Sequence, residues 1–204
     1  AVAFHDAPHD GQAHPRTLSD MQIGLESRRS VIIGNGPSIK DHDHIDMLRD
    51  HMDKTKEPLL VLASDSVLKQ CLDHKLIPSA IGVLDASPIV ATFFAGIPEL
   101  DKPIILSAFA HKTVVYLAQA LQCPIYWFMP SVEENGTYFS VDEALNIMTS
   151  HKQMPNGIWV GDSGGNVGCL LMRIAGMFPT ITDICLVGID CGYPAGMPYE
   201  DTVY

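Results

Sequence analysis

The chain is organised by continuous apolar runs, rich in β-branched residues, that alternate with amphipathic segments. A strand buried on both faces of a sheet cannot alternate polar and apolar residues, so such runs are typical of a parallel sheet with helices on both sides. The runs that fit are residues 30–34, 59–64, 80–85, 103–108, 124–129, 157–161 and 184–190. The pattern predicts a doubly wound, Rossmann-like α/β fold with a mainly parallel sheet in a single domain.

Segments with helical spacing of apolar residues lie between these runs. The expected helices cover residues 20–29, 38–53, 65–76, 88–95, 112–121, 141–151 and 164–178. Residues 1–19 are rich in His, Pro, Asp and Gly and show no period, which predicts a flexible N-terminal arm. The Rossmann-like domain is therefore expected to span residues 20–204.

Charge and composition exclude several classes of protein. Lys and Arg number 13 against 24 Asp and Glu, a formal charge of −11, and the basic residues form no stripe that could follow a phosphate backbone. No nucleic-acid partner is expected. No uncharged apolar run approaches the roughly 18 residues that span a bilayer, and the N-terminus has no signal pattern. We expect a soluble, cytoplasmic protein without a membrane span.

A glycine-rich turn directly follows the first apolar run. Ligands of open α/β sheets bind beyond the carboxyl ends of the strands, and glycines allow a tight turn there. The free N–H groups of the helix start that follows would attract a phosphate. The third glycine of the dinucleotide fingerprint is replaced by Ile39, so a nucleotide is predicted rather than NAD, with a plain strand-to-helix turn as the alternative. The residues of this turn are Gly34, Asn35, Gly36, Pro37 and Ser38.

Acidic residues end the second and third runs. Asp65, followed by Ser66, could cap the next helix or bind a ribose or base. Asp85 could bind Mg²⁺ or a sugar hydroxyl, or it could serve only as a turn residue.

A second glycine-rich turn, Ser163, Gly164, Gly165 and Asn166, precedes the last long helix. It predicts a second anion or sugar site, with close helix packing as the alternative. Because both turns follow strands of one parallel sheet, we expect residues 34–38 and 161–166 to share a pocket if strand order brings them together. Asp190 ends the last run and is expected either to orient the first turn or to contact the donor.

The histidines support no catalytic assignment. His42 and His44 alternate with aspartates, but residues two apart on a helix do not share a face, which favours a solvated helix start over a metal site. His111 follows the fourth run and could act as a general base, although a polar rim residue is favoured.

Three motifs together carry a resemblance to a known family. They are IIGNGPSI at 32–39, the block ASDSVLKQCLDHKLIPSAIGVLDASP at 63–88, and GGNVGCLLMRIAGMFPTITDICLVGIDCGY at 164–193. The set resembles the group that joins the motility accessory factor (Maf) flagellin glycosyltransferases to archaeal 6-hydroxymethylpterin diphosphokinase MptE-like proteins. The GNGPS start is also similar to that of Campylobacter-type bacterial sialyltransferases. The resemblance implies a Rossmann-like domain that binds a nucleotide-activated donor.

The resemblance also implies roles for the strand-end residues. In the glycosyltransferase branch the 34–38 turn would hold the nucleotide phosphate and ribose, Asp65 and Ser66 would lie near the ribose or base, and residues 163–166 would lie near the donor. In the kinase branch acidic motifs bind Mg²⁺ and diphosphate, which makes Asp85 a metal contact in that branch only. The sialyltransferase-type histidine lies beyond the last strand, and this chain has no His after 151, so no catalytic base is assigned.

The function implied is a nucleotide-sugar-dependent glycosyltransferase-like domain, with a CMP-nonulosonic acid as one conceivable donor and a protein or glycan as acceptor. The first alternative is a diphosphokinase that uses Mg²⁺ and ATP on a pterin-like alcohol. The second alternative is a non-catalytic nucleotide-binding module.

Overall fold

The computed structural model describes residues 21, 23–130, 133–134, 137–138, 159–161, 164–192 and 196. Their centre is a seven-stranded sheet in which all neighbouring strands run parallel, as the continuous apolar runs predict. Its strands are β1 (Arg29–Ile33), β2 (Leu59–Ser64), β3 (Ala80–Val83), β4 (Ile104–Ser107), β5 (Ile125–Pro130), β8 (Trp159–Gly161) and β9 (Asp183–Val187). A separate antiparallel pair, β6 (Glu133–Glu134) and β7 (Thr137–Tyr138), was not predicted.

The strand order is β8-β5-β4-β3-β2-β1-β9. From β1 the chain adds strands on one side only, and β9 then returns to the other side of β1, where Ile33 lies opposite Val187. The point where the order reverses therefore lies between β1 and β9. Crevices at such switch points are where open α/β sheets bind their ligands.

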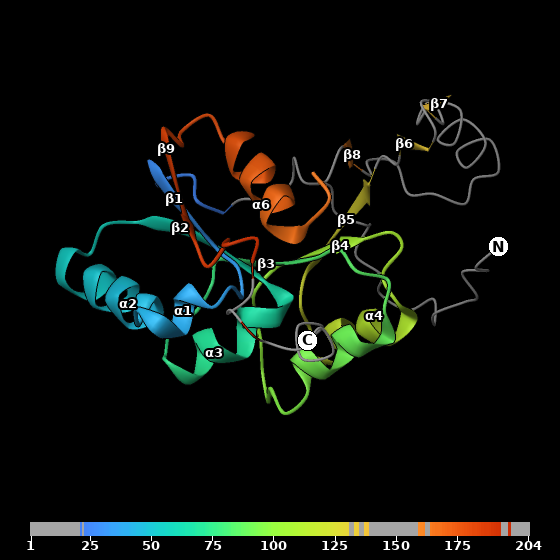
Figure 1. Ribbon diagram of the computed structural model, residues 1–204, viewed down its shortest axis with the longest axis horizontal. Coiled ribbons are helices and arrows are strands. Elements are labelled where there is room, and N and C mark those ends of the chain that lie inside the picture. The colour runs from blue at the N-terminus through green and yellow to red at the C-terminus, as the bar shows by residue number, and fades with distance from the viewer. Residues whose placement is uncertain are drawn as a thin grey trace.

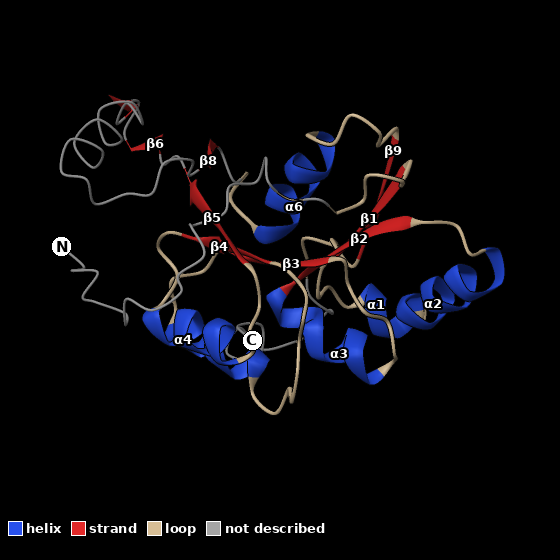
Figure 2. Ribbon diagram, turned by 180° about the vertical axis from the view of Figure 1, so that it is seen from behind, coloured by secondary structure: helices blue, strands red, loops and turns tan. Residues whose placement is uncertain are grey.

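Helices cover both faces of the sheet unequally. Figures 1 and 2 show α6 (Val167–Gly176) on one side of the sheet and the labelled helices α1 to α4 on the other. The elements of the more crowded face are α1 (Ser38–Asp41), α2 (His44–Thr55), η2 (Asp65–Val67), α3 (Leu68–Asp73), η3 (Pro88–Phe94) and α4 (Lys112–Ala120). Among the helices that the structure describes, none is both long and apolar enough to cross a bilayer.

The core follows from the alternation of β1 and β2 side chains between the two faces. Ile32 and Leu62 pack with Leu171 of α6. Val31 and Ile33 pack on the opposite face beneath the start of α2. A fully buried aliphatic side chain contributes about 1.5–3 kcal/mol, so burial of both faces explains why these strands are apolar throughout.

Four of the expected helices differ in the structure. The one expected at 65–76 begins as the 3₁₀ helix η2 and continues as α3 only to Asp73. The described residues of 20–29 form a turn rather than a helix, because Gly24 has a φ of +66°, which an α-helix does not allow, and Arg29 already belongs to β1. The expected helix at 38–53 is split into α1 and α2, because Asp43 also adopts a left-handed conformation, with φ 51°. The stretch at 88–95 is the 3₁₀ helix η3, and the helix expected at 141–151 lies outside the described residues.

We predict that Gly82→Val destabilises the fold by about 1–3 kcal/mol through overpacking. A Cβ atom at this buried position of β3 would lie 2.7 Å from Cδ2 of Leu171 and 3.1 Å from Cγ1 of Val167, both on α6. Urea denaturation would measure the change. Gly176→Ala is the matched control, because a Cβ there meets no atom within 4 Å, and its unfolding midpoint should not fall. Equal midpoints for Gly82→Val and the wild type would contradict close packing of α6 on β3.

Candidate functional site

The glycine turn after β1 is bound to the loop after β9. The N–H of Gly34 donates to the carbonyl oxygen of Val187 at 2.9 Å, and the N–H of Gly36 donates to that of Gly188 at 2.8 Å. A Cβ atom on Gly36 would lie 2.7 Å from both Cγ of Asp190 and the oxygen of Gly188. Glycine is therefore needed at position 36 for close approach of the two loops.

Asp190 fixes the end of this turn. Its carboxylate accepts from the Ser38 N–H at 2.8 Å and from the Ser38 hydroxyl at 2.6 Å. These two hydrogen bonds hold the pKa of the exposed Asp190 carboxyl below its usual value, and nearby His44 and His42 act in the same direction. The structure thus brings Asp190 to the turn with the contacts that an orienting role requires.

These contacts change the physical basis expected for phosphate binding at the turn. The N–H groups of Gly34, Gly36 and Ser38 all have intramolecular acceptors, and Pro37 has no N–H. Asn35 is exposed, and its side-chain oxygen accepts from Gln70 of α3 at 2.8 Å. The expectation of free amide donors is therefore wrong for these three groups, because their acceptors come from a loop about 150 residues away in sequence, at Asp190.

Asp65 lies at the end of β2, the next strand along the edge. The residue is only 4% exposed, and its carboxylate accepts from the Ser66 N–H at 2.8 Å. The Ser66 hydroxyl lies 3.2 Å from that of Ser64. Loss of solvation on burial, with a smaller contribution from the charge of Asp85, raises the pKa of Asp65 to about 6.

Asp85 follows β3, the strand beside β2. It is half-buried, and its carboxylate accepts from the Ser87 N–H at 2.8 Å. The structure thus places two carboxylates at the ends of neighbouring parallel strands, close enough for one charge to affect the other. Such a pair can hold ribose hydroxyls, or a Mg²⁺ ion whose remaining ligands are substrate oxygens. The described residues contain no cluster of three or more His, Cys, Asp or Glu that could hold a metal unaided.

The start of α6 lies beside the glycine turn, although the strands that precede them are far apart. Four strands separate β8 from β1. A methyl group on Gly34 would lie 2.5 Å from Cδ1 of Ile189, and one on Gly168 would lie 2.7 Å from the same atom. The two segments therefore adjoin across Ile189 because the connection from β8 carries the chain back across the sheet.

The helix start itself is well defined. Asn166 is exposed, and its side-chain oxygen caps α6 by accepting from the Cys169 N–H at 2.9 Å. Gly164 and Gly165 are exposed before it, whereas Ser163 lies outside the described residues. The positive end of the α6 dipole thus faces the same region as the 34–38 turn, which suits an anionic group. A shared ligand for the two segments stays a prediction.

His42 and His44 lie near the Asp190 carboxylate, which the sequence analysis did not predict. Because Asp43 breaks the helix, His42 ends α1 and His44 begins α2, and their ring centroids lie 5.3 Å apart. The expectation of a solvated helix start holds for the exposed His42 but not for His44, whose Nδ1 is buried and has no hydrogen-bond partner among the described residues. The Asp-His-Asp-His pattern carried no signal for this turn, because aspartate tolerates the left-handed conformation without requiring it.

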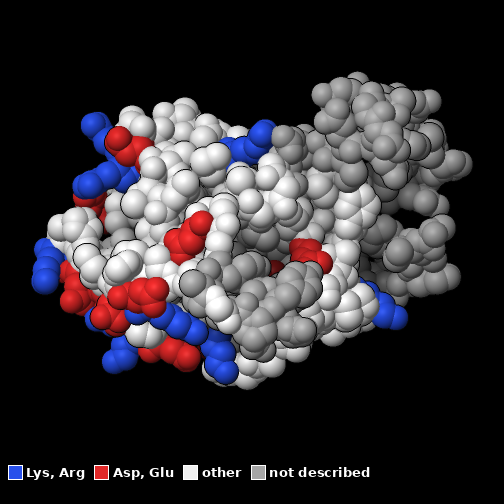
Figure 3. Space-filling model, viewed as in Figure 1, with Lys and Arg blue, Asp and Glu red and all other residues white. Residues whose placement is uncertain are grey.

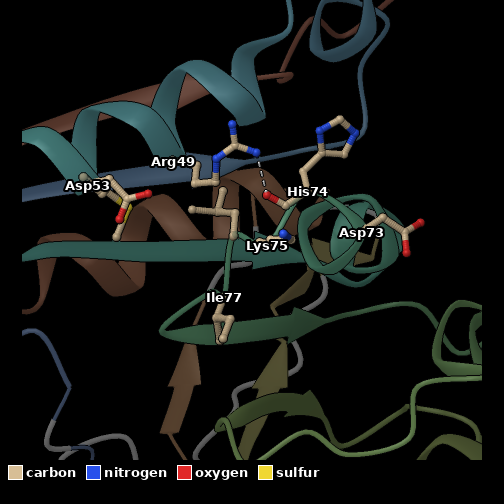
Figure 4. Close-up of a pocket in the computed structure, with 8 residues that line it drawn as sticks. Arg49, Asp53, Asp73, His74, Lys75 and Ile77 are labelled. Atoms are coloured by element: carbon tan, nitrogen blue, oxygen red, sulfur yellow. Dashed lines mark hydrogen bonds between the residues drawn. The ribbon is translucent and has the colours of Figure 1, made fainter.

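A hollow among the described residues lies away from this region. It is formed by α2, the end of α3 and the segment leading into β3, and Figure 4 shows Arg49 donating there to the backbone oxygen of His74, at 3.0 Å. Arg49 also pairs with Asp46 and Asp50, so its charge is already compensated. The lining residues include none of the predicted site residues, and the segment precedes β3, so the hollow is not at the carboxyl edge. We do not assign it a functional role.

The basic side chains of the described residues are scattered on the face seen in Figure 3. On the face seen in Figure 3, the Lys and Arg residues of the described part lie around the margin and form no continuous stripe. This distribution does not suit the backbone of a nucleic acid.

The family model of the 6-hydroxymethylpterin diphosphokinase MptE-like proteins matches residues 12–196. The chain belongs to this family. None of the curated proteins matches the chain. A solved structure of the MAf glycosyltransferase from Magnetospirillum magneticum AMB-1 is similar to this MptE-like chain, with 16% identity and a TM-score of 0.56. The match covers 93% of this chain and 27% of that one, so the likeness shows a shared fold, and this chain spans about a quarter of that protein.

We predict that Asp65→Asn stabilises this MptE-like chain at pH 7 by on the order of 2–3 kcal/mol, because it removes a buried charge and keeps the acceptor for Ser66. The folded-state pKa of Asp65, about 6, is above the unfolded value of 3.8, so the wild type binds more protons when folded and loses stability as pH rises through this window. The gain should therefore vanish near pH 4. Thermal unfolding at both pH values measures it.

The exposed Asp73→Asn variant is the control and should leave the unfolding temperature unchanged at both pH values. A destabilised Asp65→Asn protein at pH 7 would show that the charged carboxylate stabilises the fold instead.

Proposed function

We propose that this MptE-like chain is a transferase domain that binds a nucleotide-activated sugar at the carboxyl edge of β9, β1, β2 and β3. The observation that carries the proposal is the convergence of the β1 turn, the Asp65 and Asp85 carboxylates and the start of α6 on one edge, next to the strand-order reversal. The fold shared with the MAf glycosyltransferase supports glycosyl transfer. A CMP-nonulosonic acid is the first donor to test, with a protein or glycan as acceptor.

The proposed roles follow from the contacts. The start of α6, at Gly164, Gly165 and Asn166, would meet the nucleotide phosphate, because a helix N-terminus favours negative charge. Asp65 and Ser66 would face the ribose. The 34–38 turn and Asp190 would form the wall beside the phosphate, since their amide and carboxylate groups already bind one another.

The proposed reaction joins an acceptor oxygen to the anomeric carbon of the sugar. The bond from that carbon to the phosphate oxygen breaks, the nucleotide leaves with the electron pair, and the hydroxyl proton passes to a base. The helix dipole would stabilise the charge that grows on the departing phosphate, while the shape of the edge would hold the two reactants together.

A diphosphokinase that uses Mg²⁺ and ATP is the second candidate, and the adjacent Asp65 and Asp85 carboxylates favour it. Mg²⁺ is bound in proteins through one or two carboxylates together with substrate phosphates, so this pair fits the ion. In that case Asp85 and Asp65 would hold Mg²⁺, which would neutralise charge on the transferred diphosphate. The burial of Asp65 would then be compensated by a bound cation.

Ligand binding to the whole chain tests both candidates. We expect CMP or a CMP-sugar to raise the unfolding temperature more than UDP-sugar, ATP with Mg²⁺, or NAD, because a ligand that binds only the folded state stabilises it. Isothermal titration calorimetry would then give the Kd with and without EDTA. Binding that survives EDTA and Asp85→Asn supports the glycosyltransferase, whereas loss of ATP binding under both conditions supports the diphosphokinase.

Asp73→Asn, an exposed acid in the hollow described above, is the matched control for Asp85→Asn. Absence of any shift with all five ligands would contradict nucleotide binding. Tight nucleotide binding without turnover of any donor and acceptor pair would favour a non-catalytic binding module.

A further inference from the structure

The loop between β4 and α4 extends the candidate site by one strand. Val83 of β3, two residues before Asp85, lies opposite Leu106 of β4, two residues before Ala108. The ladder continues to this point on the other side, where the Ala108 N–H donates to the Phe128 oxygen at 2.7 Å. Neighbouring strands are about 4.8 Å apart, so the loop at 108–111 leaves the sheet one strand spacing from the end of β3, which Asp85 follows.

Phe109 is held in this loop with its ring in solvent. It is 53% exposed, whereas Ser107, two residues earlier, is fully buried. The Phe109 N–H donates to the Ser107 hydroxyl at 3.1 Å, and the Ala110 N–H donates to the Ser107 carbonyl at 2.9 Å. The exposed ring is thus presented by a hydrogen-bonded turn at the ligand-binding edge of the sheet. An exposed aromatic face can stack on a flat ring or on the C–H face of a sugar ring.

His111 stands two residues further on and caps α4. Its Nδ1 accepts from the Thr113 N–H at 3.3 Å, so the neutral ring carries its proton on Nε2. The half-buried imidazole therefore offers an N–H donor and not a vacant basic nitrogen. This tautomer argues against the general-base role considered for His111 and favours hydrogen bonding to a ligand oxygen or ring nitrogen.

We propose that Phe109 and His111 form the subsite for the acceptor, a small molecule or terminal residue that presents a ring with a hydrogen-bond acceptor on it. The proposal rests on the proposed transferase function. Phe109 stacks on the ring, and Nε2–H of His111 donates to the acceptor atom. β4 lies three strands from β1, about 14 Å, so Asp85 stands between this subsite and the proposed phosphate position.

A sugar ring and a pterin ring each offer a face for stacking and an atom that accepts a hydrogen bond. Two probes distinguish between them. Methyl β-galactoside represents the glycan arm, and 6-hydroxymethylpterin represents the pterin arm. Calorimetry on the full chain measures the Kd of each probe, both alone and with the nucleotide that binds best in the ligand screen. We expect one probe to bind.

The decisive variants are Phe109→Leu, which keeps an apolar side chain, and His111→Asn, which keeps a good N-cap for α4. Each should weaken the bound probe by about 3–10-fold, as expected for loss of one stacking or hydrogen-bonding contact, and should leave the nucleotide Kd unchanged. Tyr116→Leu is the control, because Tyr116 is an aromatic residue of α4 that is 64% exposed and lies outside the loop. Unfolding temperatures within experimental error of the wild type confirm that the variants fold.

The subsite is contradicted if neither probe binds. It is also contradicted if Tyr116→Leu weakens probe binding as much as the loop variants do, or if both loop variants keep the wild-type probe affinity. Probe binding that depends on Phe109 in a chain that binds no nucleotide would support the subsite and contradict the proposed function. Nucleotide binding with unaltered probe affinity in the variants would contradict the subsite alone.

Discussion

The junction between β1 and β9 is the interaction on which the arrangement of the site depends. Carbonyl groups after β9 accept from Gly34 and Gly36, and the Asp190 carboxylate accepts twice from Ser38. The two hydrogen bonds to the Asp190 carboxylate are charge-assisted and therefore stronger than those to the neutral carbonyls. Together these bonds join the two loops at the point where the strand order reverses. Because Ile189 lies inside the junction and contacts the start of α6, the same interactions also position the helix that crosses the opposite face.

The acidic pair at β2 and β3 works against the stability of the fold. Burial of Asp65 beside Asp85 disfavours its charged form, and the hydrogen bond from Ser66 offsets only part of that cost. Carboxylates with a perturbed pKa, such as Asp65, gather at functional sites because a ligand can supply the missing compensation. A hydroxyl, a cation or a proton would each do so, which is why the same two residues suit both proposed reactions.

The sequence was sufficient for the parallel sheet, although β3 and β9 end at Val83 and Val187, before the ends of the runs predicted at 80–85 and 184–190. Runs such as 59–64 are buried on both faces, so the absence of alternating polar and apolar residues in them predicted the parallel sheet directly. The contact of Asp190 with the first turn was anticipated as one of two possible roles. The backbone acceptors of Gly34 and Gly36 were not predictable, because they come from residues that are distant in sequence. The break at Asp43 was missed for a local reason, since a left-handed aspartate leaves no periodic signal. The proximity of α6 to β1 was anticipated as a possibility, but it arises from the crossover and not from adjacent strands.

The source of positive potential limits what this edge can bind. The chain has a formal charge of −11, and the three best-placed amides of the β1 turn are already used. Among the described residues of the proposed site, an anionic ligand would depend on the start of α6, whose partial charge acts only over the first turn of the helix. A phosphate would have to lie close to Asn166, on the face of the sheet that α6 covers. In the proposed site the loop after β4, at the opposite end, would then take an uncharged reactant, and Asp85 follows the strand between the two.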